Sequence, residues 1–339
     1  MRSPSITVIA TLGPASASPA AITALGEAGA DLLRINGAHL RPGQLATLLD
    51  MADRAGFGPD RVVLDLQGQK TRLGWLATPV SMRAGERLHL VPESRSSMSE
   101  GVVTVDRTAF LRALAPGDRL RIDDGRVGLT VLAVHGTRVS VEAEQDGELR
   151  SRKGIARRDR EVELEVHLLP SDRALLERAV KRGVQSLAVS YARHPDLLRL
   201  VRRYARNAAP DQPVRVYAKL EQPSALEAWS LLAEASDALW LCRGDLGGEV
   251  GLAQLPALQR RLLAQALPGA SLFMAGQVLH HMCGSPRPTR SEACHVDDLI
   301  QAGVAGFVLS DETAIGAHGP EAVRWLKRLF AAGDPTAAP

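Results

Sequence analysis

Residues 215–221 read RVYAKLE, and the next apolar run along the chain, at residues 238–243, reads ALWLCR. Both runs are short and nearly continuous in apolar residues, and amphipathic stretches such as Ala174–Arg182 alternate with runs of this kind. Apolar strands joined by amphipathic helices are typical of a parallel sheet that is covered on both faces. This part of the sequence therefore predicts an α/β fold.

The same alternation extends over most of the chain. Eight such runs occur, the other six being Ile6–Ala10, Asp31–Asn36, Arg61–Leu66, Ser186–Ser190, Ser271–Gly276 and Gly306–Ser310. Residues 75–165 instead alternate with period two, as in RLHLV at 87–91, which indicates a separate small β domain. Without these 91 residues, 248 of the 339 remain, close to the ~250 typical of a (β/α)8 barrel. We therefore expect a TIM barrel catalytic domain at 1–74 and 166–339, with an all-β lid domain at 75–165 inserted after strand 3.

The composition argues against several classes of function. The 41 Lys and Arg residues and 38 Asp and Glu residues leave a formal net charge of +3, which is not suited to coating nucleic acid or an anionic membrane. No stretch approaches the roughly 18 apolar residues of a membrane-spanning helix. Three cysteines are too few for a disulfide framework and favour a reducing compartment. We expect a cytoplasmic protein without nucleic-acid or membrane partners.

Charged residues gather where the predicted strands end. In a (β/α)8 barrel the catalytic groups come from these C-terminal ends and the loops after them. Glu221 and Asp245 follow adjacent strands and could bind one hard divalent cation that keeps open positions for substrate oxygens. Lys219, two residues before Glu221, points to the same side of its strand and could neutralise a developing oxyanion.

Two arginines add to this set. Arg34 ends the second strand and Arg72 follows the third, and guanidinium groups form paired hydrogen bonds to phosphate or carboxylate. A divalent metal, a lysine and two arginines are suited to phosphoryl transfer or enolate chemistry. For any single residue the plainest alternative is a structural ion pair that closes the barrel mouth.

Several motifs, in order and over nearly the whole length, resemble the pyruvate kinase family. These motifs are ATLGPAS (Ala10–Ser16), LLRINGAH (Leu32–His39), LDLQGQKTRLG (Leu64–Gly74), IDDG (Ile122–Gly125), RKG (Arg152–Gly154), VYAKLE (Val216–Glu221), RGDLGGEV (Arg243–Val250), SPRPTRSE (Ser285–Glu292) and LSDETAIG (Leu309–Gly316). The resemblance implies phosphoryl transfer between phosphoenolpyruvate and ADP, with ADP or ATP as co-substrate and a metal-stabilised pyruvate enolate as intermediate.

The resemblance also implies roles for individual residues. Glu221 and Asp245 would hold Mg2+ or Mn2+, and Lys219 and Arg72 would be catalytic. The substrate-binding residues would be Arg34, Lys70, Ser190, Gly244 and Gly276. The nucleotide-binding residues would be Asn36, His39, Asp124 and Lys153, with Asp124 preferred over Asp123.

The sequence also departs from the family pattern. A serine among the family's potassium ligands is Ala38 here, and Lys70 stands where potassium-dependent members carry glutamate, so we expect no K+ requirement. Gly276 replaces a threonine beside the substrate, which predicts slower enolate protonation or a pocket for a bulkier 2-oxo acid. The chain ends after the eighth barrel helix, so we expect no effector domain and no allosteric control. A homodimer formed through the barrel is one assembly that the sequence leaves open.

Other interpretations remain open at this point. One is a repurposed relative that acts on another 2-oxo acid as a kinase, decarboxylase or lyase, and another is a non-catalytic homologue that retains the ligand site. Cys242, next to Arg243, is either an activated thiol or a small packing residue. A group of histidines and cysteines near residues 280–295 lacks standard zinc-ligand spacing, so we expect structural or surface roles for it.

Overall fold

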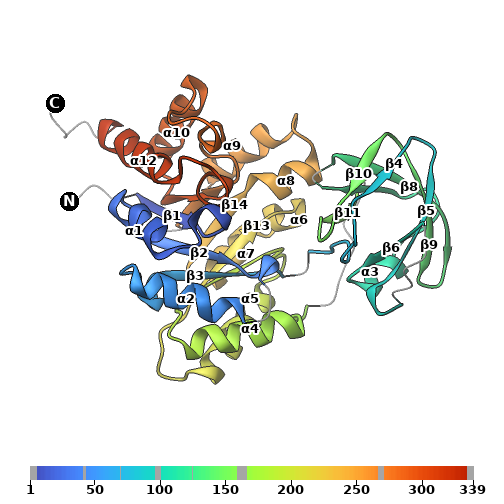
Figure 1. Cartoon of the computed structure of the whole chain (residues 1–339), viewed down its shortest axis with the longest axis horizontal. Coiled ribbons are helices and arrows are strands. Elements are labelled where there is room, and N and C mark those ends of the chain that lie inside the picture. Colours follow the sequence, from blue (N-terminus) through green and yellow to red (C-terminus); the bar gives the residue numbers. More distant parts are fainter. Residues whose placement is uncertain are drawn as a thin grey trace. The chain divides into compact units, whose positions relative to one another are not determined.

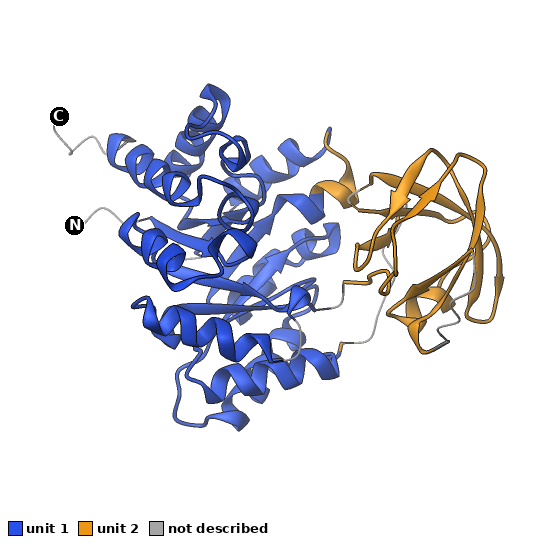
Figure 2. Cartoon of the chain, viewed as in Figure 1, with its two compact units in different colours: residues 1–68, 167–246, 253–339 blue, residues 69–166, 247–252 orange. Residues whose placement is uncertain are grey.

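The computed structural model describes residues 6–40, 43–68, 70–95, 101–123, 125–158, 166–265 and 271–333 (Figure 1). The chain divides into two compact units (Figure 2). Unit 1 comprises residues 1–68, 167–246 and 253–339, and unit 2 comprises residues 69–166 and 247–252. Among the described residues, no helix combines the length and apolarity needed to cross a membrane.

Unit 1 contains a closed barrel of eight parallel strands, which confirms the predicted (β/α)8 fold. Around the barrel the strand order is β1-β16-β15-β14-β13-β12-β3-β2. The strands are β1 (Thr7–Thr11), β2 (Leu32–Asn36), β3 (Val62–Leu66), β12 (Ser186–Val189), β13 (Arg215–Leu220), β14 (Ala238–Cys242), β15 (Leu272–Ala275) and β16 (Gly306–Leu309). Each coincides with one of the eight apolar runs, because a strand covered by helices on its outer face is apolar on both sides.

Helices surround the barrel strands (Figure 1). They are α1 (Pro19–Glu27), α2 (Gln44–Arg54), α4 (Pro170–Lys181), α5 (Pro195–Ala208), α6 (Pro223–Glu227), α7 (Trp229–Ala235), α8 (Arg243–Val250), α9 (Leu255–Gln265), α10 (Arg290–Gln301), α11 (Asp311–Ala314) and α12 (Gly319–Gly333), with 3-10 turns η1 (Pro14–Ser16), η2 (Gly37–His39), η3 (Pro59–Arg61) and η5 (His280–Cys283). Side chains cap the starts of α1, α5 and α10. At α10, Thr289 and Glu292 form a reciprocal capping box.

The barrel interior is a packed apolar core. Tyr217, Trp240 and Phe273 are buried there together, and the Tyr217 and Trp240 ring centroids lie 5.7 Å apart. Aromatic rings fill the volume that smaller side chains would leave empty at this width. Polar side chains that point inward are therefore expected at the ends of the strands rather than at the middle of the barrel.

Unit 2 consists mainly of β-strands, together with the short helix α3 and residues 247–250 of α8. Its six-stranded sheet has the order β11-β7-β8-β9-β5-β6, and a second sheet pairs β10 with β4. The elements are β4 (Val80–Met82), β5 (Arg87–Pro92), β6 (Val102–Val105), β7 (Arg119–Ile122), β8 (Val127–His135), β9 (Arg138–Ala143), β10 (Gly147–Leu149), β11 (Ile155–Arg157), α3 (Thr108–Arg112) and the 3-10 turn η4 (Glu93–Arg95). One apolar cluster, including Leu90, Ile122 and Val141, forms its core.

The boundaries of the inserted unit differ from the predicted ones. Arg72 forms a β-bridge with Gly154, and Leu73 forms one with Val105, so unit 2 begins at residue 69 rather than 75. Residues 247–252 also belong to unit 2, although the sequence placed them in the barrel domain. Isolated bridges and contacts between distant segments leave no periodic signal in the sequence, so alternation alone does not indicate them.

Candidate functional site

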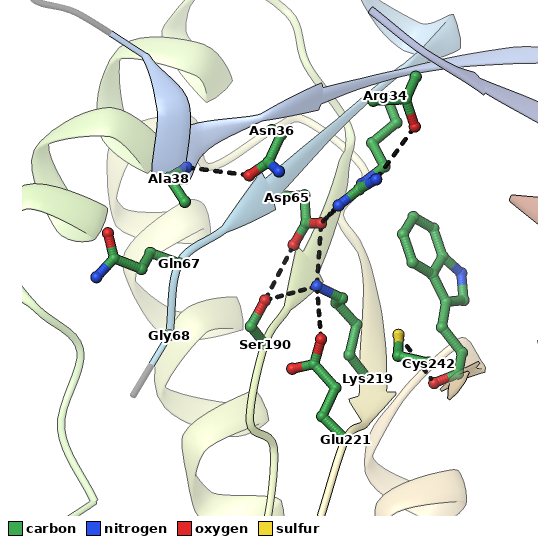
Figure 3. Close-up of polar contacts among 12 residues, drawn as sticks. Arg34, Asn36, Ala38, Asp65, Gln67, Gly68, Ser190, Lys219, Glu221 and Cys242 are labelled. Carbon is green, nitrogen blue, oxygen red and sulfur yellow. Dashed lines mark hydrogen bonds and ion pairs between the residues drawn. The ribbon is translucent and has the colours of Figure 1, made fainter. Parts of the chain in front are cut away.

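The polar side chains at the barrel mouth lie on the same inward face of their strands as the side chains of the apolar core. Residues i and i+2 of a strand share a face. Val63 and Tyr217 belong to the interior core, and Asp65 and Lys219 lie two residues after them in β3 and β13. Ser190 likewise follows the core residue Ala188 at the end of β12. The alternation of the strands thus brings these polar groups together at the C-terminal end of the barrel (Figure 3).

The Lys219 ammonium is the centre of this arrangement. Its Nζ donates to Ser190 Oγ at 2.7 Å and to Asp65 Oδ2 at 3.1 Å, and it forms an ion pair with Glu221 Oε1 at 2.9 Å. Lys219 is only 6% exposed. A lysine ammonium has three N–H donors, so these three acceptors hold it in one orientation.

Asp65 lies between two cations. Its Oδ2 accepts hydrogen bonds from Arg34 Nε at 2.7 Å and from Lys219 Nζ, and Arg34 Nη2 lies 2.6 Å from the same oxygen. Arg34 Nη1 donates to Thr11 Oγ1 at 3.1 Å, and Asp65 Oδ1 accepts from Ser190 Oγ at 3.3 Å. Asp65 therefore fixes the arginine and the lysine relative to each other.

Burial and ion pairing oppose each other in this network. Burial alone would lower the pKa of Lys219, but the carboxylates of Asp65 and Glu221 outweigh it and raise the pKa above its usual value. Burial alone would raise the pKa of Asp65, but Lys219 and Arg34 together lower it. Both groups are therefore charged at neutral pH, Lys219 as an ammonium and Asp65 as a carboxylate.

Glu221 is held by donors at both of its oxygens. Its Oε1 pairs with Lys219, and its Oε2 accepts the backbone N–H of Tyr191 at 2.7 Å. Tyr191 has φ +55°, a left-handed conformation that is costly for a residue other than glycine. This conformation accompanies an N–H directed at the buried carboxylate, and the hydrogen bond helps to fix the orientation of Glu221.

The donor set at this edge fits a hard divalent cation. Asp245 lies in the first turn of α8, directly after β14, and Glu221 directly follows the neighbouring strand β13. After burial, the charge of Glu221 and, to a smaller extent, that of Asp245 raise the pKa of the Cys242 thiol. The described residues contain no group of three or more His, Cys, Asp or Glu side chains arranged for a metal. Mg2+ is commonly bound by one or two carboxylates together with substrate oxygens, so two carboxylates are sufficient.

Cys242 is not an activated thiol. It is buried, and burial, followed by the charge of Glu221, raises its pKa well above the usual value. The thiol therefore stays protonated at neutral pH. Its Sγ lies 3.6 Å from the Trp240 carbonyl, consistent with a packing residue.

The two glycines predicted to bind substrate lie side by side. A Cβ built on Gly276 would lie 3.0 Å from the backbone nitrogen of Gly244, and Gly276 has φ +86°. Arg243 fixes this turn: its Nη2 donates to the carbonyls of Gly276 at 2.7 Å and Gln277 at 3.0 Å, and its Nη1 lies 2.6 Å from His295 Nε2. Burial, followed by the charge of Arg243, lowers the pKa of His295, so the imidazole is held neutral as an acceptor.

Asn36 and His39 lie where the second strand turns into η2. Asn36 Oδ1 accepts the Ala38 N–H at 3.1 Å and caps this turn (Figure 3). His39 is the last residue of η2. Asn36 thus ends β2 and His39 follows it, at the same end of the barrel as the Lys219 network.

The remaining predicted residues belong to unit 2. Arg72 Nη1 donates to the Arg152 carbonyl at 2.8 Å, and Lys153 Nζ pairs with Asp123 Oδ1 at 2.7 Å. Lys70 packs on the backbone of the same unit, since a Cβ on Gly154 would lie 2.5 Å from Lys70 Cε. The fourth of these residues, Asp124, lies outside the described part of the chain.

Backbone strain marks the same places. Among the described residues, four that are not glycine have positive φ values between +51° and +61°: Asp123, Arg152, Tyr191 and Gln277. Each is the sequence neighbour of a predicted site residue, namely Asp124, Lys153, Ser190 and Gly276 in turn. Such conformations cost about 1–3 kcal/mol each and gather at functional sites. The strained backbone positions therefore lie next to the residues that the sequence analysis assigned to the site.

The structure adds residues that the sequence prediction did not assign to the site. Asp65 lies in the apolar run Arg61–Leu66, but its bridging position requires partners 31 and 154 residues away. Asp172 of α4 accepts the N–H groups of Gln67 at 3.1 Å and Gly68 at 2.8 Å, and so holds the loop after β3. Gly68 is required in that loop, because a Cβ there would lie 2.0 Å from the Ser190 carbonyl. In the sequence, the signal for this interaction is an aspartate, Asp172, in the first turn of α4.

Comparisons with known proteins agree with one another. The sequence matches the family description "Pyruvate kinase, barrel domain" over residues 3–323. The pyruvate kinase of Aeropyrum pernix is 32% identical over 333 residues, covering 97% of this chain and 70% of that protein. The pyruvate kinase of Mycobacterium intracellulare is 34% identical over 342 aligned residues, covering 98% of this chain and 71% of that protein. A solved pyruvate kinase structure from Cryptosporidium parvum has the same fold, with a TM-score of 0.83 at 22% identity over 98% of this chain and 69% of that chain.

Proposed function

The chain belongs to the pyruvate kinase family, and on this premise we propose that it transfers a phosphoryl group between phosphoenolpyruvate and ADP without a K+ requirement. The observation that carries the proposal is the buried Lys219 ammonium, held by Asp65, Ser190 and Glu221 at the mouth of the barrel. Phosphoryl transfer depends mainly on positioning and on fixed charge, and this network supplies both.

Lys219 stabilises the negative charge that develops on the enolate oxygen. Because its pKa is raised, the ammonium remains charged throughout the physiological pH range. Three fixed acceptors reduce the reorganisation needed when charge appears on the substrate. Arg34, paired with Asp65, presents the remaining face of its guanidinium to substrate or nucleotide oxygens.

Glu221 and Asp245 are the residues that would hold Mg2+ or Mn2+. The bound ion would act as a Lewis acid that polarises the substrate oxygens. The Tyr191 N–H keeps the Glu221 carboxylate oriented before any ion arrives. Gly244 and Gly276, which carry no side chains, leave their backbone accessible to a substrate carboxylate or carbonyl.

The proposal gives unit 2 the remaining roles. Arg72 acts on the transferring phosphoryl group, and Lys153 and Asp124 act on the nucleotide, as Asn36 and His39 do from unit 1. Lys70 takes the place of a monovalent cation. Its ammonium is a fixed positive charge and therefore makes K+ unnecessary.

A second candidate is a related enzyme that acts on a bulkier 2-oxo acid. Gly276 is the observation that favours it, because this position carries no side chain. The turn is nevertheless fixed by Arg243, so any added volume would be limited to that of the missing side chain. A preference for larger 2-oxo acids over pyruvate in the reverse reaction would support this candidate.

The proposal is tested by pyruvate formation from phosphoenolpyruvate and ADP with Mg2+ or Mn2+ in potassium-free buffer. Glu221→Ala serves as the site variant, and Glu177→Ala, which removes an exposed partner of Arg173, serves as the matched control. We expect turnover by the wild type and the control and its loss in Glu221→Ala. Absence of turnover in the wild type, with phosphoenolpyruvate still bound, would shift the assignment to another 2-oxo acid.

A further inference from the structure

Helix α8 begins in one compact unit and ends in the other. Its residues 243–246 belong to unit 1 and its residues 247–250 to unit 2. Gly247 and Gly248 form its middle. Glycine is the least favourable residue in a helix interior apart from proline, so α8 is intrinsically weak where the chain passes from one unit to the other. Its integrity must therefore depend on contacts made elsewhere along the helix.

The C-terminal end of α8 is held by a residue from the sheet of unit 2. The last carbonyls of a helix have no partner within it. The Gly251 N–H donates to the Gly247 carbonyl at 2.9 Å, and the last turn of α8 contains no basic residue of its own. The Glu249 carbonyl instead accepts a hydrogen bond from Arg121 Nη2 at 2.6 Å. A cation in this position also interacts favourably with the helix dipole.

Arg121 is a rigid point of attachment. It lies in β7 with neighbours on both sides, opposite Ala156 of β11 and Gly128 of β8. Its Nη2 donates to a second carbonyl, that of Arg158, at 3.1 Å. Backbone pairing on both edges and two acceptors for one guanidinium nitrogen restrict the side chain strongly. The last turn of α8 is thus tied to the six-stranded sheet through one side chain.

We propose that Arg121 is a positioning residue for Asp245. By holding the last turn of α8, it keeps the helix formed across Gly247 and Gly248, so that the first turn presents the Asp245 carboxylate to the metal. The inference rests on the proposed function, which makes Asp245 a metal ligand. It adds that the inserted unit contributes to metal affinity through a residue that is not itself a ligand.

The test measures metal binding rather than turnover. Arg121→Met keeps the aliphatic stem and removes both hydrogen bonds, and Mn2+ is titrated into the full chain without substrate or nucleotide, with free Mn2+ followed by electron paramagnetic resonance. We expect binding about three to ten times weaker than in the wild type, as for loss of a charged hydrogen bond at a helix terminus. Arg121→Lys should recover part of this loss. Amide hydrogen exchange over residues 243–250 should be faster in Arg121→Met.

Two controls separate the possible failures. Arg87→Met removes an exposed arginine of the same unit, whose Nε lies 2.9 Å from Glu142, and should bind Mn2+ like the wild type. Equal weakening in Arg87→Met and Arg121→Met would overturn the inference, because general loosening of unit 2 would explain it. Wild-type affinity in Arg121→Met, with much weaker binding in Asp245→Asn, would overturn the positioning role alone. Wild-type affinity in Asp245→Asn would overturn the ligand assignment and the inference with it.

Discussion

Replacing Asp65 by asparagine removes one negative charge from between two buried cations. The side chain keeps its shape, but Arg34 and Lys219 lose the negative charge that they share. Breaking a buried ion pair by neutralising one partner typically costs about 3–5 kcal/mol, because a buried charge is left uncompensated. Since Asp65 is almost fully buried, no reduction for solvent screening applies. We expect a loss of this size in the free energy of unfolding, and a melting temperature lower by about 6–20 °C, at ~2–4 °C per kcal/mol.

The assay is urea unfolding followed by circular dichroism and tryptophan fluorescence, repeated at several pH values. The lowered pKa of Asp65 means that its contribution is present above the unfolded-state value, about 3.9, and is lost as pH falls through the folded-state value. The difference between wild type and Asp65→Asn should therefore be constant from pH 7 down to about 4 and narrow below it.

A matched control separates this effect from loss of any surface charge. Asp50 pairs with Arg182 at an exposed position, and exposed pairs contribute about 0–1 kcal/mol. Asp50→Asn should therefore leave stability nearly unchanged. The reasoning about the buried network would be refuted if Asp65→Asn cost no more than Asp50→Asn, or if its effect did not diminish in acid.

Three further predictions follow from other parts of the site. Activity should be unchanged when K+ is replaced by tetramethylammonium, whereas Lys70→Glu should acquire a K+ requirement; strong K+ dependence of the wild type would contradict the role of the lysine. Because the pKa of His295 is lowered, the stabilisation by its neutral imidazole is present above about pH 6.5, the unfolded-state pKa, and is lost as pH falls through the folded-state pKa. His295→Gln should therefore make the melting temperature less dependent on pH below pH 6.5. An unchanged pH dependence in this variant would exclude the imidazole as its cause. Gly276→Thr should be destabilised by about 1–3 kcal/mol, because φ +86° is strained for threonine, and should accelerate enolpyruvate protonation if a hydroxyl is what is lacking; an equal rate in Gly276→Ala and Gly276→Thr would assign that step to another group.

The barrel could be predicted from the sequence because its signal is local. Each strand is an apolar run such as RVYAKLE, and burial on both faces leaves a pattern within five or six residues. In the inserted unit, the alternation at 87–91 indicates β5, whereas short strands such as β4 and β11 have three residues each and produce no usable period. Bridges such as that between Arg72 and Gly154 are invisible for the same reason.

The place of the candidate residues at the strand ends could be predicted from the sequence, but the contacts among their side chains could not. Strand ends identified Lys219 and Glu221, because the fold brings such ends to one edge. The bridging position of Asp65 depends on side chains from three different strands, and no spacing in the sequence encodes it. The hydrogen bond from Arg121 to α8 joins residues 128 positions apart, so the sequence alone does not indicate it either.

The central claim is tested most directly by following phosphoenolpyruvate, ADP, ATP and pyruvate together in one reaction by 31P and 1H NMR, with Mg2+ and without K+. The account predicts that the wild type forms ATP and pyruvate in equal amounts and that Lys219→Met, with its fold intact by circular dichroism, forms neither at a comparable rate. Consumption of phosphoenolpyruvate without matching ATP, or equal rates in wild type and Lys219→Met, would contradict it.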